Sequence, residues 1–125
     1  MVIEANKTVV RRLVAEVLNG GHLEVMDELY APELVPAARR WIAPFRASFP
    51  DVHMEIVELI AEGDKVVGRF TCSATQLGAW LGHAPTGRRF ERVDEVTIFR
   101  LREGRIVHAW SLEDTLGRLQ QLGLA

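Results

Sequence analysis

The sequence predicts an α+β fold, in which N-terminal helices pack against one antiparallel sheet. Three observations predict it. Apolar side chains recur at helical spacing before Pro50, they alternate at strand spacing after it, and tight-turn sequences separate the strand-like runs. Strands joined by tight turns run antiparallel, and a sheet with one apolar face needs other elements to cover that face.

The first helix is expected over residues 6–22, NKTVVRRLVAEVLNGGH. Its valines and leucines recur at helical spacing and form one apolar face, while Arg12 and Glu16 fall on the other. We expect Asn6 to cap the start of this helix, because an asparagine side chain accepts hydrogen bonds from free backbone N–H groups. The pair Gly20–Gly21 should end it, because glycine tolerates a left-handed backbone.

Two further helices are expected before Pro50. Residues 23–33, LEVMDELYAPE, predict a short helix that ends at Pro32. Residues 36–51, PAARRWIAPFRASFPD, predict a longer helix with Pro36 in its first turn, where proline is favourable. The aromatic residues of this third helix recur every four positions and should form one stripe: Trp41, Phe45 and Phe49.

Four strands and a closing helix are expected after these helices. Alternation begins over residues 51–64 and slips near Val57–Glu58, which predicts a β-bulge. The turns EGDK and REGR and the loop LGAWLGHAPTG separate the later strands. The closing helix should begin near Glu113. The later strands are expected over residues 65–76, 88–101 and 106–112.

Composition limits the class of protein. The chain has 125 residues, which indicates one domain over residues 1–125, and its 48% hydrophobic and 26% charged content is that of a globular protein. A net charge of −2 offers no basic surface for nucleic acid or an anionic membrane. No apolar run approaches the roughly 20 residues of a membrane span. Cys72 is the single cysteine, so we expect no intrachain disulfide and a cytoplasmic protein.

Neither a metal nor a cofactor is expected. The histidines lack paired spacing, and Cys72 has no second cysteine with which to form a zinc site. The sequence has no glycine-rich phosphate loop after a strand and no Gly-x-Ser-x-Gly turn.

Several segments together resemble one family. They are residues 6–34 (NKTVVRRLVAEVLNGGHLEVMDELYAPEL), the loop GHAPTGRR and the ending HAWSLEDTLGRLQQLG. In this order they are similar to the SnoaL-like polyketide cyclase family, part of the nuclear transport factor two-like superfamily. The resemblance implies a cone-shaped α+β barrel, whose curved antiparallel sheet and N-terminal helices enclose a deep, mostly apolar pocket. It also implies a small hydrophobic substrate that bears a ketone, acid–base chemistry without cofactor or metal, and a homodimer.

The resemblance makes Ser111 a candidate site residue. Cyclases of this family bear a catalytic aspartate at this point of the last strand, and limonene epoxide hydrolase likewise places an aspartate there. Serine has no useful pKa near neutrality, so it cannot replace that acid unaided. One interpretation of SLED is a capping box, in which Ser111 starts the closing helix and Asp114 reaches back. The other is that Ser111 faces the pocket and takes part in chemistry.

Strand alternation indicates another residue that could act as the acid or base. Ala109 and Ser111 share one face of the last strand, and Glu95 and Thr97 share one face of its neighbour. If these faces line the pocket, Glu95 is the carboxylate beside an apolar wall, where its pKa should rise. The alternative is that Glu95 is a salt-bridged residue near the exposed start of its strand. The residues expected to line the ligand pocket are Val17, Trp41, Phe45, Phe49, Trp80, Ala109 and Asp114, with ordinary core packing as the alternative for the apolar ones.

The leading functional hypothesis is cyclase- or isomerase-type chemistry on a hydrophobic carbonyl compound. Glu95 would be the base, with Thr97 and Ser111 as hydrogen-bond donors to an enolate oxygen. A non-catalytic ligand-binding or accessory protein is the alternative, because the family's aspartate is absent. An epoxide-hydrolase-like enzyme is a further alternative, although Arg69 lacks an acid two residues on and the Arg92–Asp94 pair falls on the opposite face. A homodimer should form through the sheet face that bears Trp110.

Overall fold

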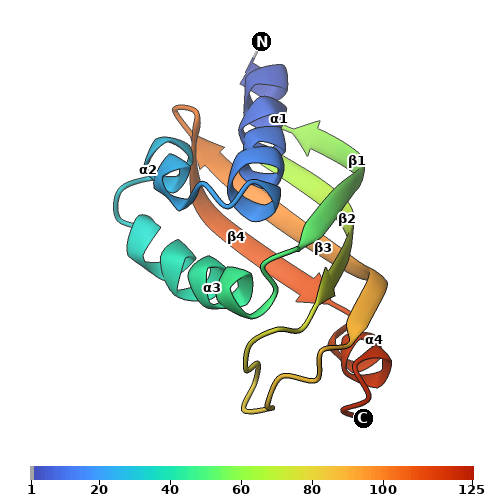
Figure 1. Cartoon of the computed structure of the whole chain (residues 1–125). Helices are drawn as coiled ribbons and strands as arrows, with labels where there is room; N and C mark the ends of the chain where they lie inside the picture. The colour runs from blue at the N-terminus through green and yellow to red at the C-terminus, as the bar shows by residue number, and fades with distance from the viewer. Residues whose placement is uncertain (1) are drawn as a thin grey trace.

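One curved sheet with helices on its inner face makes up the structure (Figure 1), a computed structural model that describes residues 2–125. The four strands are antiparallel and lie in the order β1-β2-β3-β4. They are β1 (His53–Glu62), β2 (Lys65–Thr75), β3 (Arg89–Arg102) and β4 (Arg105–Glu113). The predicted α+β fold is therefore confirmed.

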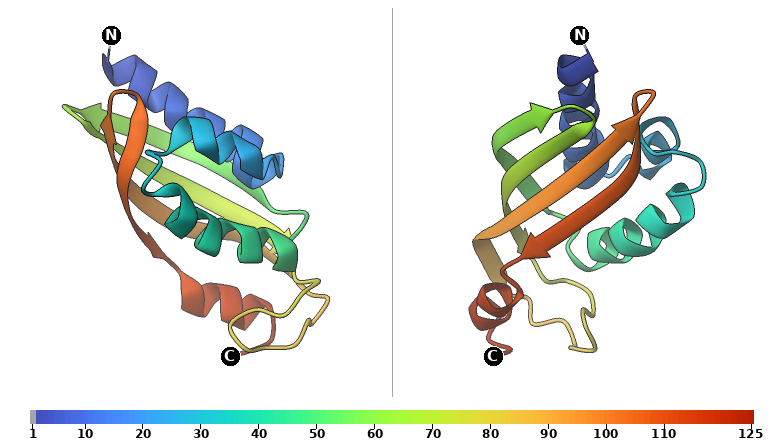
Figure 2. Two further views of the ribbon diagram at one scale, coloured as in Figure 1. Left: turned by 90° about the vertical axis from the view of Figure 1, so that its left-hand side faces the viewer. Right: turned by 180° about the vertical axis from the view of Figure 1, so that it is seen from behind.

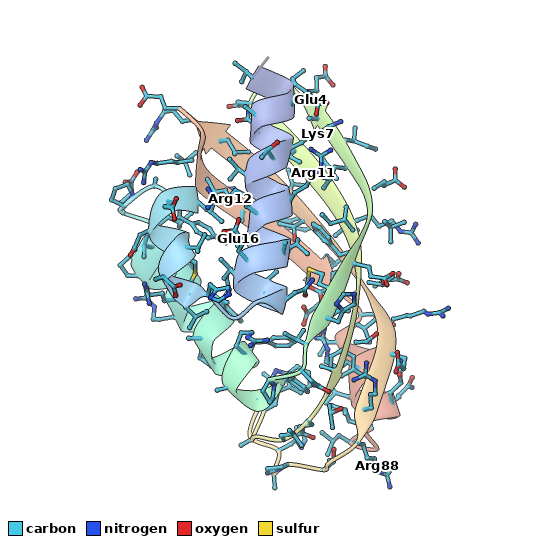
Figure 3. All side chains as sticks on the ribbon, turned by 45° about the horizontal axis from the view of Figure 1, so that its top comes forward. Glu4, Lys7, Arg11, Arg12, Glu16 and Arg88 are labelled. Atoms are coloured by element: carbon cyan, nitrogen blue, oxygen red, sulfur yellow. The ribbon has the colours of Figure 1, made fainter. Side chains whose placement is uncertain are left out.

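The first helical segment begins earlier than the sequence pattern indicated. It consists of α1 (Val2–Arg12), which continues directly into a π-helical segment, η1 (Leu13–Asn19). Asn6 therefore lies inside α1 and is buried, so the prediction that it caps the helix was wrong. Gly21 has φ +73°, as the expected left-handed stop requires. Figure 3 shows the charged side chains of this segment on its outward side, where Arg12 donates to Glu16 at 2.6 Å.

The next helical segments are η2 (Leu23–Val25), α2 (Met26–Leu29) and α3 (Val35–Ser48). Helix α2 ends before Pro32, because Tyr30 turns to an extended backbone and pairs with Ile106 of β4. Both further views place α1 and α3 across the same side of the sheet (Figure 2).

Strand register sets the inner face of the sheet. A register shift between Ile56 and Glu58 confirms the bulge predicted in β1. In the β3–β4 ladder, Thr97 pairs with Ser111 and Glu95 pairs with Glu113. Side chains two residues apart on a strand share a face, so these pairs bring polar groups onto one patch of the concave side.

Helix α4 (Thr115–Gln121) follows β4 directly. Ser111 stays in the β4 ladder, and Asp114 is the N-cap residue, whose carboxylate accepts a hydrogen bond from Gly117 N–H at 2.9 Å. The SLED capping box was therefore wrong, because pairing with β3 keeps the chain extended through Glu113. None of the helices in residues 2–125 is long and apolar enough to cross a membrane.

Candidate functional site: an apolar cavity with a carboxylate in its wall

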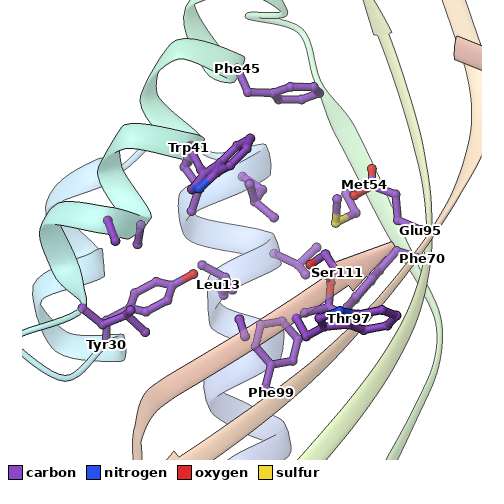
Figure 4. Close-up of a pocket in the computed structure, with 18 residues that line it drawn as sticks. Leu13, Tyr30, Trp41, Phe45, Met54, Phe70, Glu95, Thr97, Phe99 and Ser111 are labelled. Atoms are coloured by element: carbon purple, nitrogen blue, oxygen red, sulfur yellow. Dashed lines mark hydrogen bonds between the residues drawn. The ribbon is translucent and has the colours of Figure 1, made fainter. Parts of the chain in front are cut away.

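A cavity of about 570 Å³ lies between the concave face of the sheet and the helices η1 and α3 (Figure 4). Its wall is mostly apolar, with Leu13 and Leu18 from η1, Phe45 from α3, and Phe70 and Phe99 from the sheet. The volume falls within the range of about 300–1,000 Å³ typical of small-molecule sites. The volume and the apolar lining therefore suit a small organic molecule.

Two hydroxyl groups form a pair on this wall. Thr97 Oγ1 and Ser111 Oγ lie 2.8 Å apart and share a hydrogen bond, because the two residues are partners in the β3–β4 ladder. One hydroxyl donates to the other, so the acceptor keeps its own O–H free to donate. The pair can therefore offer one hydrogen bond to a ligand oxygen in the cavity.

Glu95 is a nearly buried carboxylate on the same wall, with a side chain that is 12% exposed. Arg118 donates from Nη2 to its Oε2 at 3.2 Å. Burial raises the pKa of Glu95 to about 7, helped by repulsion from Glu113 and opposed by Arg118. Glu95 thus lines the cavity and is salt-bridged, but it lies in the middle of β3 and is nearly buried, not at an exposed strand start as the alternative interpretation expected.

Arg118 is the residue that sequence reasoning missed. Its side chain is fully buried, and it donates from Nη1 to Glu113 Oε1 at 2.6 Å as well as to Glu95. Its guanidinium carbon lies 5.4, 5.4 and 4.8 Å from the ring centroids of Phe45, Trp80 and Phe90. A weak signal was present, since Arg118 shares a helix face with Leu122 four residues on, which is also buried.

Tyr30 is a second polar residue that the sequence pattern did not indicate. It lies on the cavity wall, and burial raises the pKa of its phenol. In Figure 4 its ring extends toward Leu13. No periodicity could have placed it, because it follows the end of α2 in an extended conformation.

Most of the residues proposed from the sequence lie together. The carboxylate and both hydroxyl groups line the cavity, and so do three of the apolar candidates. Trp41 is at the open side, since it remains 80% exposed while touching the cavity. The predicted residues on the wall are Glu95, Thr97, Ser111, Trp41, Phe45 and Ala109.

Four predicted wall residues lie elsewhere in the described chain. Val17 is fully buried in the core. Phe49 follows the last turn of α3 and packs against Phe45, Trp80 and Phe90, so it supports the site from behind. Trp80 joins that aromatic cluster and contacts Arg118. Asp114 is occupied as the N-cap of α4.

Glu95 should make stability depend on pH. Its folded pKa of about 7 exceeds the ordinary 4.5, so between these values the folded protein keeps a proton that the unfolded chain releases. Stability should therefore fall as pH rises through this window, by up to about 3 kcal/mol. Urea unfolding at pH 5 and pH 8 should show that the stability of Glu95→Gln relative to the parent is greater at pH 8 than at pH 5. Equal pH dependence of the two proteins would contradict the burial of this carboxylate.

The comparisons with known proteins agree with this architecture. The family model described as SnoaL-like polyketide cyclase matches residues 8–122. Aklanonic acid methyl ester cyclase DnrD of Streptomyces peucetius is 32% identical over 86% of this chain and 72% of its own length. Its counterpart DauD of Streptomyces sp. (strain C5) is 31% identical over 89% of this chain and 67% of its own.

Solved structures give the same result for the fold. The structure of TsrD from Streptomyces laurentii matches with a TM-score of 0.90 and 28% identity, over 98% of this chain and 97% of that one. Fold and sequence thus define a small α+β protein of the cyclase type. The chain belongs to the SnoaL-like polyketide cyclase family.

Proposed function

We propose that this protein catalyses proton transfer next to a carbonyl group of a hydrophobic polycyclic compound, leading to ring closure or isomerisation. The observation that carries the proposal is Glu95. It is a carboxylate with a pKa of about 7 on the wall of an apolar cavity, so near neutral pH it is present in both protonation states. A general base works best when its pKa lies near the working pH.

The reaction needs no outside reactant. Glu95 removes a proton from the carbon beside a ketone or ester, and the enolate oxygen accepts a hydrogen bond from the Thr97–Ser111 pair. The enolate carbon then bonds to a second carbonyl carbon, and the oxygen formed there takes the proton back from Glu95. The product is an isomer of the substrate. A single well-placed donor to the enolate contributes about 3 kcal/mol by oxyanion-hole precedent.

The two curated relatives suggest the first substrate to try, because both are named aklanonic acid methyl ester cyclases. The protein should convert this ester to a cyclised isomer of unchanged mass, followed by liquid chromatography and mass spectrometry. In heavy water it should also catalyse deuterium incorporation at the acidic carbon of polycyclic β-keto esters. Tight binding of such esters with neither conversion nor exchange would refute the proposal.

A non-catalytic ligand-binding protein is the second candidate. Ser111 favours it, because the family's cyclases bear an aspartate at that position. The two candidates differ in the exchange experiment, since a binding protein would hold the ketone without exchanging its protons. The epoxide-hydrolase-like alternative has little support, because Arg69 and Asp94 form an exposed pair at 3.9 Å on the outer face of the sheet.

A homodimer through the outer face of the sheet is also part of the proposal. Trp110 and Leu112 of β4 are 51% and 65% exposed there, and a dimer contact would remove them from water. Analytical ultracentrifugation at micromolar concentration should give twice the monomer mass, and Trp110→Glu should reduce it to the monomer mass. A parent protein that sediments as a monomer would contradict this arrangement.

A further inference from the structure

Helix α4 places the fully buried guanidinium group of Arg118 behind the cavity wall. Arg118 donates to two carboxylates, Glu95 at 3.2 Å and Glu113 at 2.6 Å. Its Nε has no hydrogen-bond partner among the described residues, and its guanidinium lies against three aromatic rings. Burying an arginine with one unpaired N–H is unfavourable, and buried ion pairs often add little stability. Stability alone is therefore a poor reason for this arrangement.

We propose that Arg118 is a positioning residue, which fixes the Glu95 carboxylate in the cavity wall and, with Glu113, sets how readily Glu95 takes and returns a proton. This inference rests on the proposed function, in which Glu95 is the base. It adds that Glu95 does not act alone. Two carboxylates share one cation, and the base works as part of this three-residue unit.

The β3–β4 ladder brings the Glu95 and Glu113 carboxylates close enough together to share Arg118. Glu95 and Glu113 are cross-strand partners, so their side chains leave neighbouring points of the sheet. Arg118 is the cation that pairs with both, and the unit carries two negative charges against one positive when fully ionised. A proton on one carboxylate relieves this imbalance. Glu95 is nearly buried while Glu113 is 35% exposed, so the unit extends from the cavity toward solvent.

The aromatic rings keep the guanidinium in place. Phe45, Trp80 and Phe90 come from α3, the loop after β2, and β3, so three parts of the chain hold the same group. A cation over aromatic faces is attracted to them, and a buried one cannot turn to water. A planar guanidinium can also donate to two carboxylates at once, which a lysine ammonium does with less fixed geometry.

Burial has the largest effect on the pKa of Glu95, and three neighbouring groups from three different elements modify it further. Glu113 of β4 repels its negative charge and raises its pKa, while Arg118 of α4 lowers it. The thiol of Cys72 on β2 is the third neighbour, and burial raises the pKa of that thiol to about 12, so it stays neutral. Removal of Glu113 and removal of Arg118 should therefore move the Glu95 titration in opposite directions.

The test measures the titration of Glu95 directly, in the whole protein without substrate. Protein labelled with carbon-13 in its glutamate carboxyl groups is titrated by NMR, and the Glu95 signal is assigned as the one lost in Glu95→Gln. Glu113→Gln should lower the Glu95 midpoint by about one pH unit or more. Arg118→Met should raise it, and Arg118→Lys should return it toward the parent. Glu91→Gln, which removes an exposed carboxylate paired with Arg89, is the matched control and should leave it unchanged.

The activity readout is the pH profile. For the exchange of a β-keto ester, the acidic limb of kcat should move to lower pH in Glu113→Gln, and Arg118→Lys should lower kcat more than it changes KM. A Glu95 midpoint that stays at its parent value in Glu113→Gln overturns the inference, and this variant decides the matter even if Arg118→Met does not fold. Because the titration needs no substrate, failure of the proposed function would appear separately, as absent exchange with a normal set of titrations.

Discussion

Glu95→Gln is expected to slow turnover of a ketone substrate by about 10²–10⁴-fold, the usual cost of removing a general base. Glutamine keeps the shape of glutamate, and its amide oxygen can still accept the hydrogen bond from Arg118. The cavity and the fold should therefore persist while the proton acceptor is lost. In the parent, the rate should rise with pH and reach half its maximum near the Glu95 pKa of about 7, because only the ionised carboxylate removes a proton.

The matched control is Asp94→Asn on the same strand. Asp94 precedes Glu95, but its carboxylate is exposed on the outer face, 3.9 Å from Arg69. This variant should react at the parent rate. If Glu95→Gln also reacts at the parent rate, Glu95 is not the base. If neither the parent nor any variant exchanges a bound ketone, the non-catalytic candidate takes the lead.

Strand alternation was sufficient to place the carboxylate and the two hydroxyl groups of the cavity wall. Glu95 and Thr97 lie on one face of β3 because that part of the strand is regular, and Ser111 follows because it pairs with Thr97. The fold class was predictable for the same reason, since the change from helical to strand spacing at Pro50 marks the change of layer. The positions of Glu95, Thr97 and Ser111 agree with those expected from the sequence, and the catalytic roles of these residues stay predictions.

Helix ends and tertiary pairings were not predictable in the same way. The start of α1 was misplaced because Asn6 suits both a cap and a buried position, and only packing decides between them. Arg118 was missed because charged helical residues are usually exposed, and because Glu95, one of its two carboxylate partners, lies on a strand 23 residues earlier in the sequence. Phe49 belongs to the predicted aromatic stripe, but α3 ends just before it and the chain direction changes.

Phe49→Ala is expected to destabilise the protein by about 3–5 kcal/mol, the range for truncating a buried phenylalanine. Its side chain is fully buried, and its ring centroid lies 4.8, 5.5 and 5.3 Å from those of Phe45, Trp80 and Phe90. These three rings are the ones that contact Arg118. The truncation should therefore leave a cavity that also loosens the support behind Glu95.

Urea unfolding at pH 7 measures this loss, and Trp41→Ala is the matched aromatic control. Trp41 lies on α3, the helix that Phe49 follows, but is 80% exposed, so its truncation should change stability by only about 0.5 kcal/mol. For ligand binding the order of the two effects should be reversed, with Trp41→Ala losing more affinity than Phe49→Ala, because Trp41 lines the cavity and Phe49 does not. If Phe49→Ala does not fold, Phe49→Leu should fold with a loss of about 1–2 kcal/mol, because most of the buried volume is kept. Equal stability of the Phe49 and Trp41 variants would mean that the aromatic cluster does not support the site. The fixed position of Arg118 would then have to be explained by other contacts.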